Sequence, residues 1–214
     1  MMPIYGLPKL EGPRDANRIY GVVVGIVTNN KDPQGMARVK VKLPALSDDY
    51  ETQWARLVTP MAGNDRGLYY LPEVNDEVLV AFEDGIIERP FVLGAVWNGK
   101  DKPPESNSDG QNNMRTTKSR SGHIIRLDDT AGGEKVQIID KTGNNLMVIS
   151  SSDNTIHISA NSDITIESKT GKLKMSAVGV EITSTTDVKI QANATIDIQA
   201  TGQTSIQGAL VKLN

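Results

Sequence analysis

Few side chains in this sequence have the types and spacing that chemistry requires. The chain has two histidines, and one of them, His157, stands between Ile156 and Ile158. Strand alternation turns it away from the face of these neighbours, so we interpret it as a solvated surface histidine rather than a metal ligand. Asp128 and Asp129 would suit a cation, but a turn after a strand explains them better. We therefore expect no catalytic residue, no metal site and no cofactor.

The acidic residues of the last third do not form the carboxylate pair that glycoside hydrolysis needs. They are scattered among lysines, at Asp163, Glu167, Asp187 and Asp197. Gly132-Gly133 is not a phosphate-binding loop, since no helical pattern follows it. The spacing supports no Ser/His/Asp set, which leaves a catalytic role without candidates.

A basic row lies earlier in the chain, at Arg38, Lys40 and Lys42, which alternate with Val39, Val41 and Leu43. Such a row suits the outer face of a small barrel, and some barrels of this kind bind oligonucleotides. Nucleic acid is not the expected partner here. The net charge is −3, and no stacking aromatic stands on the same strand. We expect this face to dock on another protein subunit.

The last third of the chain carries a repeat with a period of eight. Pairs of apolar residues, each split by one polar residue, start at steps of 8, 9, 7, 8 and 8. Such a repeat indicates one strand-like unit copied along an axis, and we interpret the slip at Leu173 as a local bulge. The predicted core pairs are Ile156 and Ile158, Ile164 and Ile166, Leu173 and Met175, Val180 and Ile182, Val188 and Ile190, and Ile196 and Ile198.

Composition divides the chain into two parts. All nine aromatic residues lie at or before Trp97, and all ten prolines lie at or before Pro104. A narrow prism of stacked strands has no room for aromatics, and proline would remove donors from its ladders. We therefore predict an N-terminal arm over residues 1–17, a first domain over 18–98, a linker over 99–120 and a spike domain over 121–214.

The first domain reads as five short strands separated by turns. We expect them at Ile19–Val27, Ala37–Leu43, Trp54–Val58, Val78–Phe82 and Phe91–Trp97. Five strands in so short a segment favour a closed barrel of the OB type. Further strands are expected at Ile124–Leu127, Val136–Ile139 and Leu146–Ile149, while Met114–Arg120 is either an outer strand or more linker.

A strand with one narrow apolar stripe cannot bury that stripe alone. Three octads span 24 residues, the separation of Ile156 and Val180, which is enough for one coil of a single-chain solenoid. Three chains that each supply one face per level fit the same spacing. Solenoids usually need larger side chains and caps, so a homotrimer is favoured. Replacing Ile166 by Asp would then bury three like charges at one level and prevent trimerisation.

Several segments resemble the spike proteins of contractile injection machines, which include the phage baseplate protein V group and the VgrG proteins of type VI secretion. The resemblance rests on Ser121–Thr130, on Lys141–Asn145 and on the octads that follow. In the first domain, Leu71–Phe82 and Pro90–Trp97 are similar to the family's OB signature. The resemblance covers about residues 17–214.

The resemblance implies an all-β fold, with an N-terminal OB-fold barrel followed by an intertwined, trimeric, triple-stranded β-helix. It implies a structural spike that sits on a hub at the tube tip and punctures a target envelope when the sheath contracts. The sequence departs from VgrG in lacking the large hub domain before the barrel, so we expect the hub to be a separate protein.

The same resemblance implies a small PAAR-type tip protein, which we expect to dock on Ala209, Leu210, Val211, Lys212, Leu213 and Asn214. The start of the chain lacks a signal-peptide pattern. We therefore expect synthesis in the cytoplasm, assembly into the baseplate of a tail-like particle and transient contact with a target membrane. The alternatives are a trimeric β-helical fibre or adhesin, and a single-chain β-solenoid acting on carbohydrate.

Overall fold

The structure is a computed structural model that describes residues 18–47 and 49–212. The predicted N-terminal arm, residues 1–17, lies outside the described residues, as do Leu213 and Asn214 of the predicted tip surface. The chain divides after Ser162 into two units, which are described separately below. No helix among the described residues is both long enough and apolar enough to cross a membrane.

The N-terminal part of the first unit is a closed five-stranded barrel. Its strands neighbour one another in the order β1-β2-β3-β7-β6, with β1 closing the sheet against β6. β3 runs parallel to β7 and the other neighbours are antiparallel. The strands are β1 (Val22–Asn29), β2 (Arg38–Lys42), β3 (Ala55–Leu57), β6 (Glu77–Phe82) and β7 (Pro90–Ala95). All five strands predicted for this domain are therefore present, with ends shifted by up to three residues.

The barrel interior is filled by small branched side chains. Val39, Val41 and Leu43 are fully buried, as their alternation with the basic row predicts. The remaining core residues come from the other four strands, namely Val27, Ala55, Val78, Val80, Phe82 and Val92. Gly25 permits this packing. A Cβ at its position would lie 2.3 Å from Val41 Cγ1 and 2.9 Å from the carbonyl oxygen of Lys42.

Two small elements lie outside the five barrel strands. β4 (Ala62–Gly63) and β5 (Arg66–Gly67) form a two-stranded hairpin between β3 and β6. A 3-10 turn, η1 (Glu83–Gly85), follows β6. No α-helix occurs among the described residues. The all-β class and the OB-type barrel predicted from the sequence are thus confirmed.

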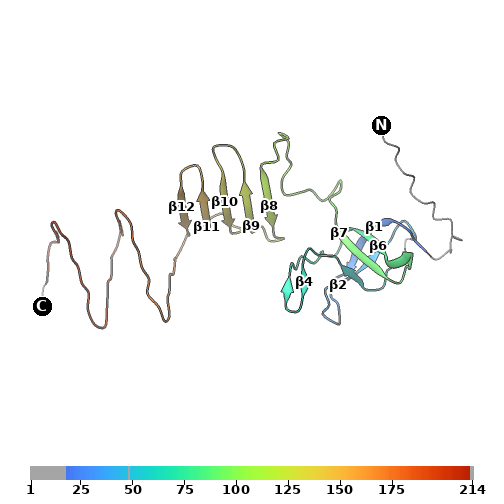
Figure 1. Ribbon diagram of the computed structural model, residues 1–214, viewed down its shortest axis with the longest axis horizontal. Coiled ribbons are helices and arrows are strands. Elements are labelled where there is room, and N and C mark those ends of the chain that lie inside the picture. Colours follow the sequence, from blue (N-terminus) through green and yellow to red (C-terminus); the bar gives the residue numbers. More distant parts are fainter. Residues whose placement is uncertain (1–17, 48, 213–214) are drawn as a thin grey trace, which may run out of the picture. The chain divides into compact units, whose positions relative to one another are not determined.

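The first unit also contains a five-stranded antiparallel sheet with the order β12-β11-β10-β9-β8 (Figure 1). Its strands are β8 (Met114–Lys118), β9 (Ile124–Asp128), β10 (Lys135–Ile139), β11 (Leu146–Ser150) and β12 (Thr155–Ser159). Of the two alternatives for Met114–Arg120, the structure shows the outer strand. Consecutive strands from β8 to β11 are joined by turns with Gly122, Gly132 and Gly143 at positive φ, where glycine is favoured.

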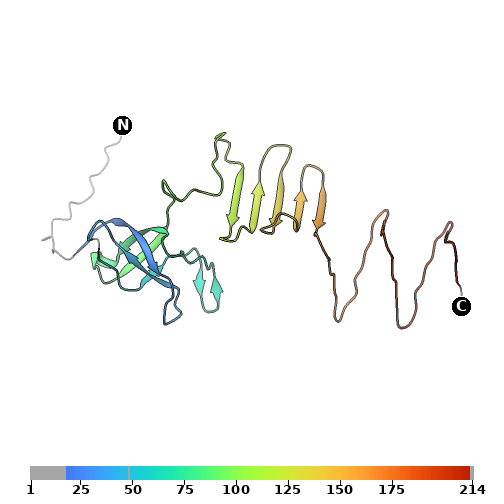
Figure 2. The same cartoon turned by 180° about the vertical axis from the view of Figure 1, so that it is seen from behind.

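The second unit is an open trace of straight legs and sharp corners (Figures 1 and 2). Each leg has six residues, and in the first five legs the apolar pair occupies the second and fourth positions. The legs are 163–168, 172–177, 179–184, 187–192, 195–200 and 203–208. Six extended residues span about 20 Å.

The irregular steps of the repeat lie in the corners. The corner at 169–171 has three residues, the next has only Val178, and the following corners have two. This accounts for the steps of 9 and then 7 without any change in leg length. The local irregularity expected at Leu173 therefore lies in the corners on either side of its leg, because the chain absorbs the extra residue outside its extended segments.

Candidate functional site

One face of the β8–β12 sheet carries two rows of apolar side chains. The register places Ile125, Ile138, Met147 and Ile158 opposite one another in the first row. Leu127, Val136, Ile149 and Ile156 form the second row. Apart from Met147, these residues are between 38 and 65% exposed. A continuous apolar face of this kind is typical of a surface that another chain covers.

The pairs predicted from the sequence to form a core are not buried within the single chain. Ile156 and Ile158, which end the two rows, are 65 and 57% exposed. The pairs of the second unit are between 49 and 71% exposed, namely Ile164, Ile166, Leu173, Met175, Val180, Ile182, Val188, Ile190, Ile196 and Ile198. The physical reason is that each leg carries one apolar stripe, and no second layer of this chain lies over it. A packed core at these twelve positions therefore requires further chains.

The rows that precede Ile156 were not predicted from the sequence. Strands β9–β11 do not follow the octad spacing, so the repeat does not include them. Their alternation of apolar and polar residues was the signal that would have found them. The apolar face of the sheet therefore begins before the octads and continues into the first octad pair.

The backbone of the second unit lacks partners as well. Every strand of the β8–β12 sheet is paired in a ladder. Within the described residues 163–212, by contrast, no backbone N–H donates to a backbone carbonyl. Only Gly171 and Thr186 have their N–H bound by hydroxyl oxygens, at Ser168 and Ser184. Extended backbone whose N–H and C=O groups lack ladder partners can pair with strands of other chains along both edges.

The polar face of the sheet holds His157. It lies in a cross-strand row with Val148, Gln137 and Arg126, on the side opposite Ile156 and Ile158. His123 has a local structural role, because its Nδ1 accepts a hydrogen bond of 3.2 Å from the backbone N–H of Lys141. Among the described residues, no three of His, Cys, Asp or Glu gather in a group that could hold a metal ion.

Asp128 and Asp129 each have a structural partner. Asp128 is buried and accepts a hydrogen bond of 3.0 Å from the backbone N–H of Thr130. Hydrogen bonds from Thr130, with smaller contributions from Lys135 and Arg126, lower the pKa of Asp128. Asp129 accepts a hydrogen bond from Arg115. Asp128 therefore fixes the turn after β9, and Asp129 joins that turn to Arg115 on β8.

The basic face of the barrel contains aromatic rings that were not predicted there. The guanidinium carbon of Arg38 lies 5.9 Å from the Trp54 ring centroid, and Lys40 Nζ lies 5.8 Å from it. Arg56 stands opposite both Arg38 and Phe91, with its guanidinium carbon 4.3 Å from the centre of the Phe91 ring. These rings come from β7 and from the residue before β3. The pattern within β2 could not reveal them. Together, Arg38, Lys40, Trp54, Arg56 and Phe91 form what we call the cation–aromatic face.

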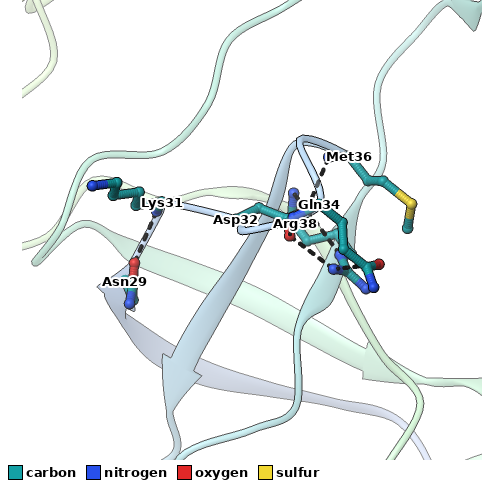
Figure 3. Close-up of polar contacts among 6 residues, drawn as sticks. All are labelled: Asn29, Lys31, Asp32, Gln34, Met36 and Arg38. Atoms are coloured by element: carbon teal, nitrogen blue, oxygen red, sulfur yellow. Dashed lines mark hydrogen bonds and ion pairs between the residues drawn. The ribbon is translucent and has the colours of Figure 1, made fainter.

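Two cations of this face are paired with carboxylates. The Arg38 guanidinium donates to Asp32 through Nε at 2.9 Å and through Nη2 at 2.7 Å. Figure 3 shows that the Asp32 carboxylate also accepts from the backbone N–H groups of Gln34 and Met36, each at 3.0 Å. The side chain of Asp32 is only 3% exposed. These interactions, that with Arg38 first, hold the pKa of Asp32 far below its usual range.

Lys40 is paired in a similar way. Its Nζ lies 2.7 Å from Glu51 Oε2, and Thr28 Oγ1 donates to the other oxygen of the same carboxylate at 2.6 Å. Both contacts, that with Lys40 first, lower the pKa of Glu51. The cation–aromatic face is therefore largely neutralised. Such a face suits the planar and apolar groups of a protein partner better than a phosphate backbone.

A second exposed surface surrounds the β4–β5 hairpin. Met61, Leu68, Tyr69 and Tyr70 are between 46 and 73% exposed. The hairpin is held by the backbone N–H of Leu68, which donates to Met61, and by Thr59 Oγ1, which donates to the carbonyl of Leu68. Large aromatic side chains on a fixed hairpin are common at protein interfaces.

The predicted tip residues are described only in part. Leu210 and Val211 are 74 and 45% exposed, and Ala209 and Lys212 are exposed as well. Ala209 stands at a corner, one leg beyond the corner at Thr201 and Gly202.

Comparison with known proteins gives one matching family, described as the Type VI secretion system/phage-baseplate injector OB domain, over residues 23–97. The matched segment coincides with the closed barrel from β1 to β7. Several curated spike proteins are also similar to the chain. The type VI secretion system spike protein VgrG2a of Pseudomonas aeruginosa is 30% identical over 132 residues, which cover 58% of this chain and 15% of the relative.

Two further relatives extend the same picture. VgrG1a of Pseudomonas aeruginosa is 27% identical over 73% of this chain and 26% of its own length. VgrG3 of Vibrio cholerae is 24% identical over 60% of this chain and 13% of its own length. The chain thus spans between 13 and 26% of the length of these three relatives. The resemblance to VgrG-like spikes predicted from the sequence is confirmed.

Proposed function

We propose that this chain is the structural central spike of a contractile injection machine and acts as an intertwined homotrimer. The observation that carries the proposal is the second unit, where the backbone has no ladder and the apolar pairs have no cover. Three copies that interleave their legs provide both at once. The similarity to VgrG spike proteins supports the same role.

The homotrimer accounts for the open legs better than a single-chain solenoid does. Successive coils of a solenoid form backbone hydrogen bonds to one another, and residues 163–212 form none. The apolar rows on β9–β12 favour the trimer too, because they lead directly into Ile156 and Ile158. Three copies that bring these rows together about one axis form a core with no aromatic residue in it.

The proposed core of the trimer consists of the same pairs that the single chain leaves exposed. Leu173 with Met175, Val180 with Ile182 and Val188 with Ile190 would each supply one face of a level. The branched and flexible side chains of these pairs suit a narrow interior that excludes water. Burial by two partner copies would remove the exposed apolar surface along the whole shaft.

The barrel is the end of the spike that we assign to the hub, as a separate protein. Its cation–aromatic face offers stacked, ion-paired side chains, and the β4–β5 hairpin offers exposed tyrosines. At the other end, we assign the surface around Ala209–Lys212, together with Leu213 and Asn214, to a PAAR-type tip protein. A truncation after Ile198 that still captured the tip protein would contradict this assignment.

The proposed role is mechanical and not catalytic. When the sheath contracts, the trimer transmits the force to its tip and makes transient contact with the target membrane. Interchain ladders satisfy the backbone along the shaft and leave no free lateral edge, which resists shear. The same role places synthesis in the cytoplasm and final assembly in the baseplate of a tail-like particle.

The mass of the purified chain in solution tests the proposal. We expect a particle of about three times 23.2 kDa that resists SDS at room temperature and forms short rods in electron micrographs. A single-chain mass at micromolar concentration would refute the spike and favour a solenoid. A trimer that never enters tail-like particles, when produced with the neighbouring tail proteins, would instead favour a fibre or adhesin.

A further inference from the structure

The outer wall of the barrel is apolar along strands β1, β6 and β7. A row of directly opposed residues runs from Val22 on β1 through Ala81 on β6 to Phe91 on β7. In the next row, Val24 stands opposite Leu79. Val22 and Val24 are 52 and 45% exposed. The solvent-facing side of an antiparallel sheet usually carries polar residues, so these five residues, which we call the apolar wall, indicate a surface that another protein covers.

Arg56 lies at the border of the apolar wall. It stands opposite Phe91 in the parallel β3–β7 ladder and opposite Arg38 in the antiparallel β2–β3 ladder. Its guanidinium carbon lies 4.3 Å from the centre of the Phe91 ring, a distance at which cation and ring attract each other. Two arginines opposite each other would repel, but the ion pair with Asp32 neutralises Arg38. The positive charge of Arg56 is therefore the one that this border leaves uncompensated.

Arg56 differs from the other cations of the cation–aromatic face in its lack of a carboxylate partner. Arg38 is paired with Asp32 and Lys40 with Glu51. No carboxylate in the part of the chain that the structure describes forms an ion pair with Arg56, whose side chain is exposed. A guanidinium binds a carboxylate through two parallel N–H···O hydrogen bonds. The donors of Arg56 are therefore available to a carboxylate of another protein.

A hollow of about 270 Å³ lies beside Arg56. Trp54 and Phe91 contribute aromatic rings to its lining. Glu88 lines the hollow too, but it forms no ion pair with Arg56. The space admits the end of an incoming side chain, and a charged hydrogen bond is stronger where such a side chain displaces water. An arginine beside aromatic rings is also the composition typical of residues that contribute most to binding at an interface.

We infer that the barrel binds the hub protein through the apolar wall and through an ion pair between Arg56 and an Asp or Glu side chain of the hub. This inference rests on the proposed assignment of the barrel to the hub and specifies the chemistry of that contact. Charge complementarity selects the carboxylate. A cation of the partner would be repelled by Arg56, and a neutral partner surface would bury its guanidinium without compensation. The apolar wall supplies the area removed from water, and the ion pair fixes the orientation of the two proteins.

The affinity of the purified full-length chain for the separately purified hub protein tests the inference. Arg56→Ala should weaken binding by about tenfold or more, because the carboxylate of the hub is then buried without its partner. Arg56→Lys should weaken binding less, since it keeps the charge and loses only the two-pronged contact. Arg56→Glu should weaken binding most. Replacement of the pairing hub carboxylate by Arg should then restore binding to Arg56→Glu while weakening binding to the wild type.

Lys31→Ala and Glu88→Gln are the matched controls. The first removes one exposed positive charge from the same barrel, and the second removes a carboxylate from the same hollow. Neither should weaken binding. A loss of binding in Glu88→Gln would mean that the hub brings a cation to the hollow, which overturns the inference. Unchanged binding in Arg56→Ala, or equal losses in Arg56→Ala and Lys31→Ala, would overturn it as well.

Two measurements separate this inference from the proposed function. If the wild-type chain does not bind the hub protein, the assignment of the barrel to the hub fails. If the wild type and Arg56→Ala bind equally well, that assignment stands and only the role of Arg56 fails. Without the hub, Arg56→Ala should keep the mass and the thermal midpoint of the wild type. A smaller mass would show that a second copy of this chain supplies the carboxylate, which contradicts the inference.

Discussion

Shortening Ile166 to alanine probes whether the octad pairs form a shared core. In the isolated chain the side chain of Ile166 is 70% exposed, so the substitution removes little packing from the chain itself. In the proposed trimer the same position would be buried by two partners. Truncation of a buried isoleucine to alanine costs about 2–5 kcal/mol, and three copies change at one level, so the trimer should lose about 6–15 kcal/mol.

The assay is the urea midpoint for trimer dissociation, followed by light scattering on a sizing column at fixed chain concentration. The Ile166→Ala midpoint should fall well below that of the wild type. The Ile166→Asp variant should not trimerise at all, since three carboxylates would be buried together. The matched control is Thr165→Ala, one residue away on the outer face, which should shift the midpoint little.

If the urea midpoint of Ile166→Ala equals that of the wild type, the assignment of the apolar pair to the trimer core is refuted. Equal losses for Ile166→Ala and Thr165→Ala would refute it too, because the leg would then have no inner and outer side. Loss of the barrel fold in either variant would point to a contact that the chain makes on its own.

Three further predictions concern the barrel. Gly25→Ala should destabilise the barrel by about 1–3 kcal/mol, because its Cβ would lie 2.3 Å from Val41 Cγ1, while Gly94→Ala, with nothing within 4 Å, should have little effect on the thermal midpoint. Asp32→Asn should lower the thermal midpoint near neutral pH. The pKa of Asp32 is lower in the folded chain than in the unfolded chain, where it is about 3.9, so the ionised carboxylate stabilises the fold above that pH and the stabilisation fades as the pH falls below it. The thermal midpoints of the wild type and of Asp32→Asn should therefore converge in acid. A constant difference between the two midpoints from pH 6 to pH 2 would contradict this. Trp54→Ala should weaken capture of the hub protein without changing the trimer mass, and unchanged capture would remove the cation–aromatic face from the hub interface.

Local alternation predicts those parts of this molecule that depend on one strand at a time. Val39, Val41 and Leu43 point inward because strand geometry alternates side chains, and this needs no knowledge of the neighbouring strands. The octad pairs are recognisable for the same reason, since each leg repeats one short pattern. The sequence of one strand does not show whether they are buried, because Met175, Ile182 and Ile190 are 71, 68 and 68% exposed in the single chain and only the proposed partner copies would cover them.

Features that depend on how the strands of the barrel pair could not be predicted from alternation within one strand. Trp54 lies beside Arg38 and Lys40 only because β3 pairs with β2, and Phe91 reaches Arg56 only through the parallel pairing with β7. The Asp32 loop is similar, because its carboxylate is fixed by Arg38, six residues further along. Long-range pairing and side-chain hydrogen bonds of this kind leave no periodic trace in the sequence.

The corners of the second unit bear on how such a shaft tolerates change in length. The corner at 169–171 is one residue longer than the two-residue corners that follow, and the corner at Val178 is one residue shorter. Every later leg therefore returns to the period of eight. An insertion at the corner formed by Thr201 and Gly202 would leave both adjoining legs intact, whereas one inside a leg would turn the rest of that leg inside out. The corners are therefore the natural attachment points for added peptide, and a fused cargo segment belongs there rather than along the flat sides.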